Sequence, residues 1–251
     1  MGKRIRPFRY KVFGQGHPVV IIPGLDGITE FFDDIYPALS PKYKVIKYYL
    51  PLLEEAKAAG QKYTFEFVAS DIKKILDELG IKKTHVIGES WGGAVAQIFA
   101  LEYPDMLDKL VVLSSTPRFD LSTKVKIQQI FFPFVPMWLF ARVHVYEVCE
   151  PRDPWWAKQM FIRNAEWADH KTVVVRARLA AKFDITERVS KITAPTLIMM
   201  GGADRFTGEG SQLLHKMLPN SKLVEIPDVG HLLHMIKTEQ FLEAVEKHFQ
   251  S

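Results

Sequence analysis

A serine, an aspartate and a histidine in this chain stand where nucleophilic catalysis could use them. The serine, Ser90, lies in the pentapeptide GESWG, which matches the pattern G-x-S-x-G. A run rich in β-branched residues precedes it and an apolar run of helical spacing follows, so we expect Ser90 on a tight strand-to-helix turn. The glycines suit such a turn, because bulky side chains two residues on either side would clash. The alternative is a structural serine in a glycine-rich bend.

A serine nucleophile needs a base, and the base needs a carboxylate that orients it. His231 is the preferred base among eight histidines, because it follows a strand and a short loop in KLVEIPDVGH. Asp204 is the preferred carboxylate, because it lies just beyond the strand in LIMMGGAD, where open α/β sheets keep their sites. Asp228 competes for this role, but so close a neighbour of His231 is more often a turn former. Along the chain, Ser90 comes first, then Asp204, then His231. A serine on such a strand-to-helix turn typically precedes its acid and then its base in this order.

The oxyanion that forms during acyl transfer needs two N–H donors. We expect one from the backbone of Trp91, directly after the nucleophile, and one from the loop IIPGLDG, where Leu25 has the matching position. Gly24 and Gly27 would let that backbone approach closely, although they would equally suit an ordinary turn. Glu89, beside the nucleophile, could orient a substrate amine or support local structure, and the sequence leaves both open.

The elements that must position these residues alternate as parallel βαβ units do. We predict strands at 18–23, 44–49, 84–88, 109–115, 194–202 and 222–226, and helices at about 64–80, 94–103, 211–217 and 238–249. The alternation stops between 116 and about 192, a segment rich in large aromatic residues whose only strand signal is the ambiguous run TVVV. We therefore expect an α/β protein: a mostly parallel, doubly wound core domain of residues 1–115 and 193–251, with residues 116–192 inserted as a helical cap.

Four segments together resemble the α/β-hydrolase superfamily: PVVIIPGLDG, GESWGGAVAQIFALEYPDMLDKLVVLSS, APTLIMMGGADR and IPDVGHLLH. They occur in the family's order and spacing over most of the chain. The resemblance implies the α/β-hydrolase fold with a helical cap, and a serine hydrolase with no cofactor and no metal. It implies Ser90, Asp204 and His231 as the catalytic triad, with the backbone of Leu25 and Trp91 as the oxyanion hole. Dehalogenase relatives use an aspartate nucleophile, so Ser90 argues against that branch.

Two departures from the family pattern bear on the activity. Pro23-Gly24 stands where many members have His-Gly, and YYLPLLEEAKAAGQKYTF replaces the usual Asp-x-Arg-Gly-x-Gly-x-Ser loop. We expect a carboxylesterase that cleaves esters of small to medium apolar acyl groups. Proline-iminopeptidase-like and thioester or carbon–carbon bond hydrolases are alternatives, although the His-Gly-Gly-Pro-Gly loop of the iminopeptidases is missing. A resemblance to the non-catalytic relative maspardin keeps a binding protein, partner-directed or receptor-like, as an alternative of another class.

The predicted cap contains the aromatic stretch QQIFFPFVPMWLFARV. Phe134, Trp138 and Phe140 could line an acyl pocket there, which is the substrate-binding role we assign to them. The alternative is that such aromatics pack the cap onto the core domain. A lipase that works at a membrane surface, through the basic N-terminus and this cap, is a further alternative.

Composition narrows the partners and the location. The net charge is +4 and the pI about 9.0, and no aromatic-interleaved basic motif follows the basic N-terminus, so we expect no nucleic-acid partner. The single cysteine, Cys149, cannot form an internal disulfide, which fits a reducing compartment. The N-terminus lacks the apolar core of a secretory signal, and no uncharged apolar run reaches about 18 residues. We expect a cytoplasmic protein with a small-molecule ester substrate, without stable membrane insertion and of open oligomeric state.

Overall fold

A mostly parallel sheet forms the centre of the protein in a computed structural model that describes residues 8–120 and 130–251. Its strand order is β1-β3-β2-β4-β5-β6-β7, and all neighbours are parallel except β1 and β3. The strands are β1 (Tyr10–Phe13), β2 (His17–Ile22), β3 (Tyr43–Tyr48), β4 (Thr84–Glu89), β5 (Leu107–Leu113), β6 (Thr196–Gly201) and β7 (Ser221–Ile226). The predicted fold class, a doubly wound and mostly parallel sheet, is confirmed.

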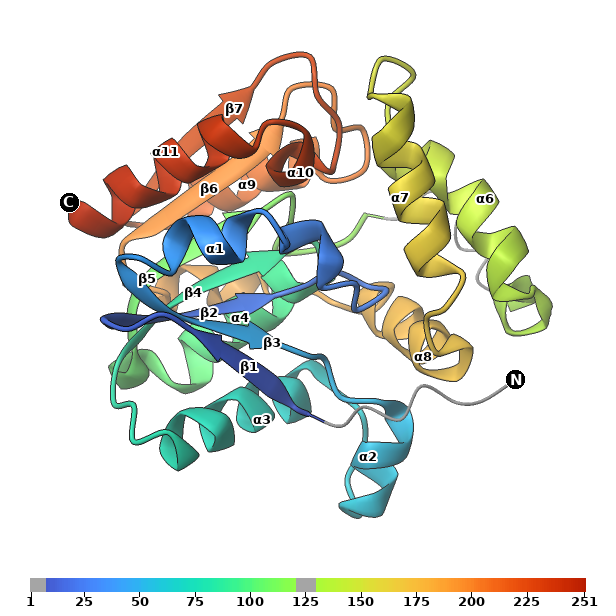
Figure 1. Ribbon diagram of the computed structural model, residues 1–251. Helices are drawn as coiled ribbons and strands as arrows, with labels where there is room; N and C mark the ends of the chain where they lie inside the picture. Colours follow the sequence, from blue (N-terminus) through green and yellow to red (C-terminus); the bar gives the residue numbers. More distant parts are fainter. Residues whose placement is uncertain (1–7, 121–129) are drawn as a thin grey trace.

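Helices cover both faces of the sheet (Figure 1). One face packs against α1 (Ile35–Leu39), α10 (Leu233–Ile236) and α11 (Thr238–Gln250), and the other against α2 (Leu53–Ala58), α3 (Phe65–Glu78), α4 (Trp91–Glu102) and α9 (Gly208–Met217). Short 3₁₀ turns join these elements at η1 (Glu30–Phe32), η2 (Pro104–Met106), η3 (Phe132–Phe134) and η4 (Thr186–Lys191). Successive residues of a strand enter opposite cores, as Val19 and Val20 do, which explains why the central strands are apolar throughout.

Helix α3 shows how local sequence sets the element boundaries. Thr64 is the N-cap, and its hydroxyl accepts a hydrogen bond of 3.1 Å from the backbone N–H of Phe67. Gly80, with φ +67°, follows the helix end in the left-handed conformation that glycine adopts readily. Both residues lie at the ends of the range predicted for this helix, 64–80.

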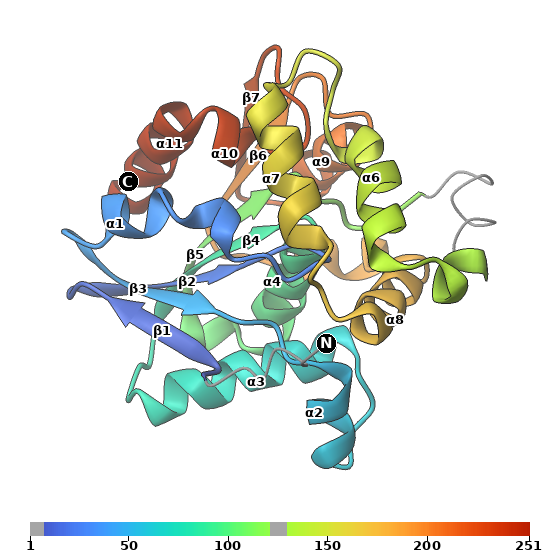
Figure 2. The ribbon, with the colours of Figure 1, turned by 45° about the vertical axis from the view of Figure 1, so that its right-hand side comes forward.

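Three further helices lie beyond the carboxyl ends of the strands, over one end of the sheet (Figures 1 and 2). They are α6 (Met137–Val148), α7 (Trp155–Ala165) and α8 (His170–Ala180), all within the segment expected to form the cap. Residues 121–129 of that segment and the basic residues at positions 3–6 lie outside the described residues. The ambiguous run TVVV belongs to α8, whose N-cap Asp169 accepts a 2.9 Å hydrogen bond from Thr172 N. We call α6, α7 and α8 the cap helices.

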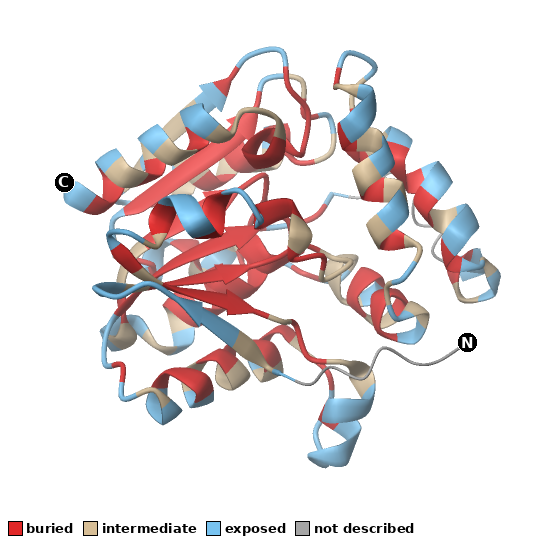
Figure 3. Cartoon of the chain, in the orientation of Figure 1, coloured by how far each residue is buried: buried red, intermediate tan, exposed pale blue. Residues whose placement is uncertain are grey.

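Two loops meet where the direction of strand addition reverses. From β2 the chain continues to β3 on one side, and from β4 it continues to β5 on the other, while β2 and β4 are neighbours. Open α/β sheets bind ligands at such a switch point. These strands are buried along most of their length (Figure 3). None of the described helices is long and apolar enough to span a membrane.

Candidate active site

Ser90 sits on a strained turn between β4 and α4. Its backbone angles are φ 53° and ψ −114°, a conformation that a residue with a side chain rarely adopts. Two hydrogen bonds hold it: Ser90 N donates to Leu113 O at 2.8 Å, and Ser115 Oγ donates to Ser90 O at 2.7 Å. The turn presents the Ser90 side chain to a pocket at the switch point, as the sequence led us to expect.

The glycines around Ser90 are required by close approach of neighbouring chain segments. A Cβ atom on Gly88 would lie 2.4 Å from Gly92 O, and one on Gly92 would lie 2.4 Å from Pro23 O. A Cβ atom on Gly93 would lie 2.5 Å from Cβ of Ser115. The two glycines of the pattern G-x-S-x-G therefore allow α4 to pack tightly against β4 and the loop after β2, and Gly93, just outside the pattern, allows its packing against the loop after β5.

Asp204 and His231 approach each other from the loops after β6 and β7. Nδ1 of His231 lies 2.9 Å from Oδ2 of Asp204, so a neutral imidazole protonated at Nδ1 donates to the carboxylate. Asp204 Oδ1 also accepts backbone hydrogen bonds from Phe206 at 2.9 Å and from Thr207 at 3.0 Å. The Thr207 hydroxyl donates to Asp204 Oδ2 at 2.7 Å. These bonds fix the carboxylate and hence the orientation of the imidazole.

The environment shifts the pKa values of this pair in opposite directions. Burial opposes ionisation of Asp204, but the nearby His231 and the hydrogen bonds from Thr207 outweigh it and hold the Asp204 pKa well below its usual range. Burial also opposes the charged form of His231, but the carboxylates of Asp204 and Glu89 outweigh it and raise the His231 pKa. The site therefore stabilises an imidazolium, the form that a general base takes after it accepts a proton.

The backbone around His231 is bound to the core domain and to the cap segment. Ser114 Oγ donates to His231 O at 2.9 Å from the loop after β5. His231 N donates to Val148 O, at the end of α6, at 3.2 Å, and Gly230 N donates to Asp153 Oδ1 at 3.3 Å. The loop that carries the imidazole is thus anchored to two residues between α6 and α7.

The β2 loop, expected to supply the first oxyanion donor, passes beside Ser90. Its turn is closed by a 3.0 Å bond from Gly27 N to Gly24 O, with Gly27 at φ 71°. The Leu25 carbonyl accepts a 2.8 Å hydrogen bond from Nη1 of Arg176, a fully buried residue of α8. Trp91, the second expected donor, begins α4, where the first backbone N–H groups have no carbonyl one turn before them.

The Trp91 side chain joins the same contact between α8 and the core domain. Its Nε1 donates to the Arg176 backbone carbonyl at 3.1 Å, and its ring stacks on Phe65 with centroids 4.6 Å apart. Arg176 also donates to the Tyr63 hydroxyl at 2.8 Å and to Pro51 O at 3.1 Å. One buried guanidinium of a cap helix thus holds the β2 loop and packs against Trp91, 5.6 Å from its ring.

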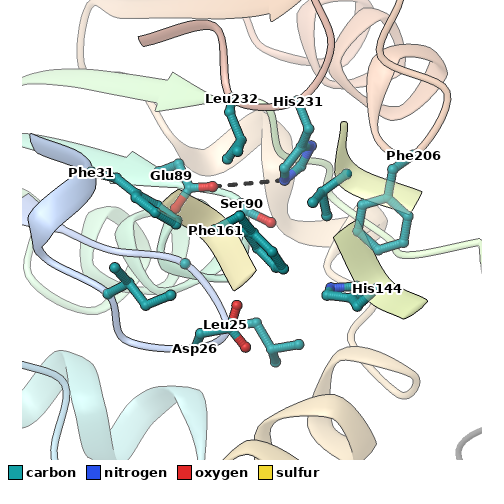
Figure 4. A pocket seen from close by; sticks show the side chains of 13 residues that line it. Leu25, Asp26, Phe31, Glu89, Ser90, His144, Phe161, Phe206, His231 and Leu232 are labelled. Atoms are coloured by element: carbon teal, nitrogen blue, oxygen red, sulfur yellow. Dashed lines mark ion pairs between the residues drawn. The ribbon is translucent and has the colours of Figure 1, made fainter. Parts of the chain in front are cut away.

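The loops enclose a pocket with about 440 Å³ of empty space, part of it open to solvent (Figure 4). Glu89 lines it beside Ser90, and Oε1 of Glu89 lies 3.7 Å from Nε2 of His231. Burial, together with the neighbouring Asp26 and Asp204, raises the Glu89 pKa to about 7, although His231 and a hydrogen bond from Gly24 oppose the shift. The lining residues are Gly24, Leu25, Asp26, Ile28, Phe31, Glu89, Ser90, His144, Val148, Phe161, Phe206, His231 and Leu232.

The three aromatic residues expected to bind substrate do not line this pocket. Phe134 is 84% exposed and Trp138 is 54% exposed. The Trp138 ring packs against the guanidinium of Arg142. Phe140 stacks on Phe132, with centroids 4.2 Å apart, and on the pocket residue His144, with centroids 4.8 Å apart. For Trp138 and Phe140 the physical reason is helical periodicity, which places them off the buried face of α6, whereas Phe134 is the exposed last residue of the 3₁₀ turn before that helix. The inward face of α6 consists of Met137, Ala141, His144, Val145 and Val148.

Other pocket residues were missed or left open by the sequence. His144 and Phe161 carry no motif, but both have the spacing of an inward helix face, which would have indicated them. Asp26 had a signal, because it directly follows Leu25 in the predicted oxyanion loop. Arg176 had none, since an arginine in a helical run is normally assigned to the surface.

A possible metal-ligand group lies at the opposite end of the sheet. His17 Nε2 is 2.7 Å from Asp108 Oδ2, and the rings of His17 and His85 lie 4.3 Å apart. The three side chains offer ligand atoms within 4.8 Å of one another. The Lys83 ammonium, 3.5 Å from Asp108, already supplies positive charge there, so an ion pair accounts for the arrangement.

Comparison with known proteins identifies the family to which a chain with this site geometry belongs. Residues 17–173 match the family model described as the alpha/beta hydrolase fold. The chain belongs to the α/β-hydrolase family. This α/β-hydrolase is 28% identical over 236 residues to a Caulobacter sp. (strain K31) protein whose name describes it as a carbamate hydrolase, RutD, covering 90% of this chain and 88% of that protein.

A second sequence relative is an esterase, and one solved structure with the same fold is that of a lactonase. The pimeloyl-[acyl-carrier protein] methyl ester esterase of Aeromonas hydrophila is 25% identical over 256 residues, covering 94% of this chain and 96% of that protein. The crystal structure of the enol-lactonase from Burkholderia xenovorans LB400 superimposes with a TM-score of 0.85 at 18% identity, covering 96% of each chain. The structural likeness supports the fold, and the sequence relatives place the chain among hydrolases.

Proposed function

We propose that this α/β-hydrolase is a serine carboxylesterase in which Ser90 attacks the ester carbonyl. The arrangement of three residues carries the assignment: Ser90 on its strained turn, and His231 beside it, bonded through Nδ1 to Asp204 at 2.9 Å. That bond leaves Nε2, the atom on the pocket side, free of its proton in the neutral form. An imidazole with an unprotonated Nε2 is the base that a serine nucleophile requires.

The reaction then follows in two steps. His231 accepts the Ser90 proton as Oγ bonds to the acyl carbon, and the carbonyl oxygen, now negative, accepts hydrogen bonds from the backbone N–H groups of Leu25 and Trp91. The ester bond breaks, and the alcohol leaves with the proton from His231. Water, deprotonated by His231, attacks the acyl-enzyme and releases the acid and Ser90. Loss of one oxyanion donor typically costs about two to three orders of magnitude in kcat.

A series of p-nitrophenyl esters from acetate to long acyl chains, with a serine-directed phosphonate, tests this function. We expect turnover of the short and medium esters, covalent labelling of Ser90, and loss of both in Ser90→Ala. Turnover of the esters by Ser90→Ala at the wild-type rate would overturn the assignment. Absence of turnover and labelling in the wild-type protein would favour a binding protein on the same fold.

The relatives set the order of the alternatives. The related esterase of Aeromonas hydrophila favours ester hydrolysis, and the RutD relative makes carbamate hydrolysis the second candidate. Substituting a carbamate of p-nitrophenol for the ester in the same assay separates the two. The expected cytoplasmic location and the absence of a nucleic-acid partner stay predictions.

A further inference from the structure

We infer that the pocket above Ser90 recognises a positively charged amine on the substrate, held by the carboxylates of Asp26 and Glu89. Both residues line the same pocket as Ser90, from the β2 loop and from the end of β4 (Figure 4). Because this assignment rests on the proposed hydrolase function, it specifies which ester that function would prefer: a short aliphatic acyl group that ends in an ammonium.

Asp26 has an acceptor atom that no described residue satisfies. Its Oδ1 is buried and accepts no hydrogen bond from the described part of the chain. A buried acceptor without a partner destabilises the protein, and more so when the group is charged, because the desolvation of that atom is not compensated. Such atoms in native proteins call for a partner, and a substrate N–H group in the pocket would be one.

Glu89 supplies a second carboxylate to the same space. Its side chain is only 5% exposed. Its Oε2 lies so close to the backbone of Gly24 that a Cβ atom added to Gly24 would be 2.5 Å from it. Burial raises the pKa of Glu89 and of Asp26, and the charge of Asp26 adds to the shift at Glu89. His231 opposes this shift at Glu89, and His144 and Arg176 oppose it at Asp26. A bound cation would relieve the repulsion between the carboxylates and favour the ionised form of both.

The described walls of the pocket favour a cation over an anion. Phe31 and Phe161 stack with centroids 6.0 Å apart, and Phe206 meets the His231 ring edge-on at 5.5 Å. Aromatic faces attract ammonium groups, because the ring quadrupole places negative charge on the face. The described lining residues include no lysine and no arginine, so only the imidazoles of His144 and His231 could offset the repulsion that Asp26 and Glu89 exert on an acyl group ending in a carboxylate.

Two basic residues that act on Asp26 already have other hydrogen-bond partners. Arg176 uses its guanidinium on Tyr63, Leu25 and Pro51. His144 holds Glu147 Oε2 with its Nδ1 at 2.8 Å. A simple apolar acyl group would leave Asp26 Oδ1 unpaired, whereas an ammonium of matching length would satisfy it.

Matched ester pairs test this specificity. The p-nitrophenyl esters of 6-aminohexanoate and heptanoate, and of 3-aminopropanoate and butanoate, differ only by an ammonium in place of a methyl group. After correction for spontaneous hydrolysis, we expect kcat/KM to favour the ammonium member of at least one pair by about tenfold or more. Asp26→Asn, which keeps the shape and removes the charge, should lower this ratio by about tenfold. Asp34→Asn, an exposed carboxylate outside the pocket, should leave it unchanged.

Using a ratio within each variant cancels a general loss of activity or folding. Hydrolysis of both members at equal rates, or preference for an ester that ends in a carboxylate, would overturn the amine site while leaving the esterase function intact. Binding of hexylammonium and of hexanoate to Ser90→Ala, measured by calorimetry, gives an arm that needs no turnover. Tighter binding of hexylammonium supports the site, and equal or weaker binding contradicts it.

Discussion

Nε2 of His231 lies 3.7 Å from Oε1 of Glu89, the residue that precedes Ser90. Nε2 is the atom proposed to accept the serine proton. When Nε2 carries a proton, the Glu89 carboxylate attracts the charged imidazolium and so favours the protonated form of His231. Because Asp204 and Glu89 both raise the His231 pKa, the imidazole stays protonated, and unable to act as a base, to a higher pH than either carboxylate alone would impose.

Glu89→Gln should move the acid limb of the pH–rate profile. Removing one negative charge lowers the His231 pKa, so the neutral base persists to lower pH, and we expect the acid limb of kcat/KM to fall by about one pH unit. The profile is measured with a neutral alkyl ester. Glu102→Gln, at the exposed far end of α4, is the control and should leave the limb in place. An unmoved or raised limb in Glu89→Gln would show that Glu89 does not act on His231.

Asp204→Asn should nearly abolish turnover while ground-state binding survives. An amide cannot hold the Nδ1–H tautomer of His231, and the same change in another Ser-His-Asp triad costs roughly 10⁴-fold in kcat. Asp184→Asn is a matched control, because Asp184 Oδ1 accepts a 2.9 Å bond from Thr186 N in a similar turn outside the pocket. If the two variants lost activity equally, the Asp204 effect would be one of local folding.

Arg176→Lys should slow the chemistry more than it weakens binding. Lysine cannot reproduce the three hydrogen bonds by which Arg176 holds Leu25 O, Pro51 O and the Tyr63 hydroxyl. We expect kcat to fall by about 10–100-fold with KM little changed, since the β2 loop shapes the proposed oxyanion hole.

Two further variants separate positioning from folding in this case. Tyr63→Phe removes one of the three bonds of Arg176, together with the 2.8 Å bond from the Tyr63 hydroxyl to Pro51 O, and should give a smaller loss of kcat in the same direction. Arg178→Lys, on the exposed side of α8, should have no effect. A rise in KM without a change in kcat would assign Arg176 to substrate binding instead of to the oxyanion loop.

Gly92→Ala should destabilise the fold, whereas Gly208→Ala should not. The added methyl at position 92 meets the carbonyls of Pro23 and Ile22 at 2.4 and 2.5 Å, and both are backbone atoms that cannot rotate away. We expect a loss of about 2–4 kcal/mol in the free energy of unfolding, measured by urea titration. At position 208 the methyl meets only Met200 Cε at 3.4 Å, so a change within about 1 kcal/mol is expected.

His234 should make the protein less stable as the pH falls. Its ring is buried and stacks on Phe32 at 4.4 Å, and neither ring nitrogen has a hydrogen-bond partner among the described residues. Burial, with a smaller effect of His231, lowers its pKa to about 3. Between pH 6.5 and about 3 the unfolded chain binds a proton that the folded chain does not. As the pH decreases through this range, His234 therefore lowers the free energy of unfolding by up to about 1.4 kcal/mol per pH unit.

His234→Gln removes this linkage and should give a shallower slope of unfolding free energy against pH between 6.5 and 4. Only the slope carries the test, because the substitution also changes packing and so shifts the curve as a whole. A slope equal to that of the wild-type protein would show that His234 is protonated in the folded state.

The sheet was predictable because its strands are short apolar runs bounded by glycine, proline and charged residues. The six parallel strands all overlap their predicted ranges. Strand β1 (Tyr10–Phe13) was missed because it is an edge strand whose largely exposed residues pair with β3 on one side only. The run TVVV looked ambiguous because its β-branched residues favour strands, while packing in α8 decides for a helix.

The candidate site was predictable where the backbone constrains the sequence. Ser90 was predictable from the neighbouring glycines, which close packing requires. Asp204 and His231 were predictable from their positions just after the ends of strands. The pocket walls were not predictable in this way, because any apolar residue on the inward face of a cap helix can serve. Arg176 owes its place to partners distant in the chain, which no local pattern records.

The anchoring of the cap segment has a consequence for turnover. Val148 and Asp153 hold the backbone of the His231 loop, while Arg176 holds the loop of Leu25. A movement that lifted these cap residues away to admit substrate would loosen the base and the oxyanion loop together. An opened protein would then be an incomplete catalyst, because neither the base nor the oxyanion loop would be held in position beside Ser90. Return of the cap residues over a bound ligand would restore both at once.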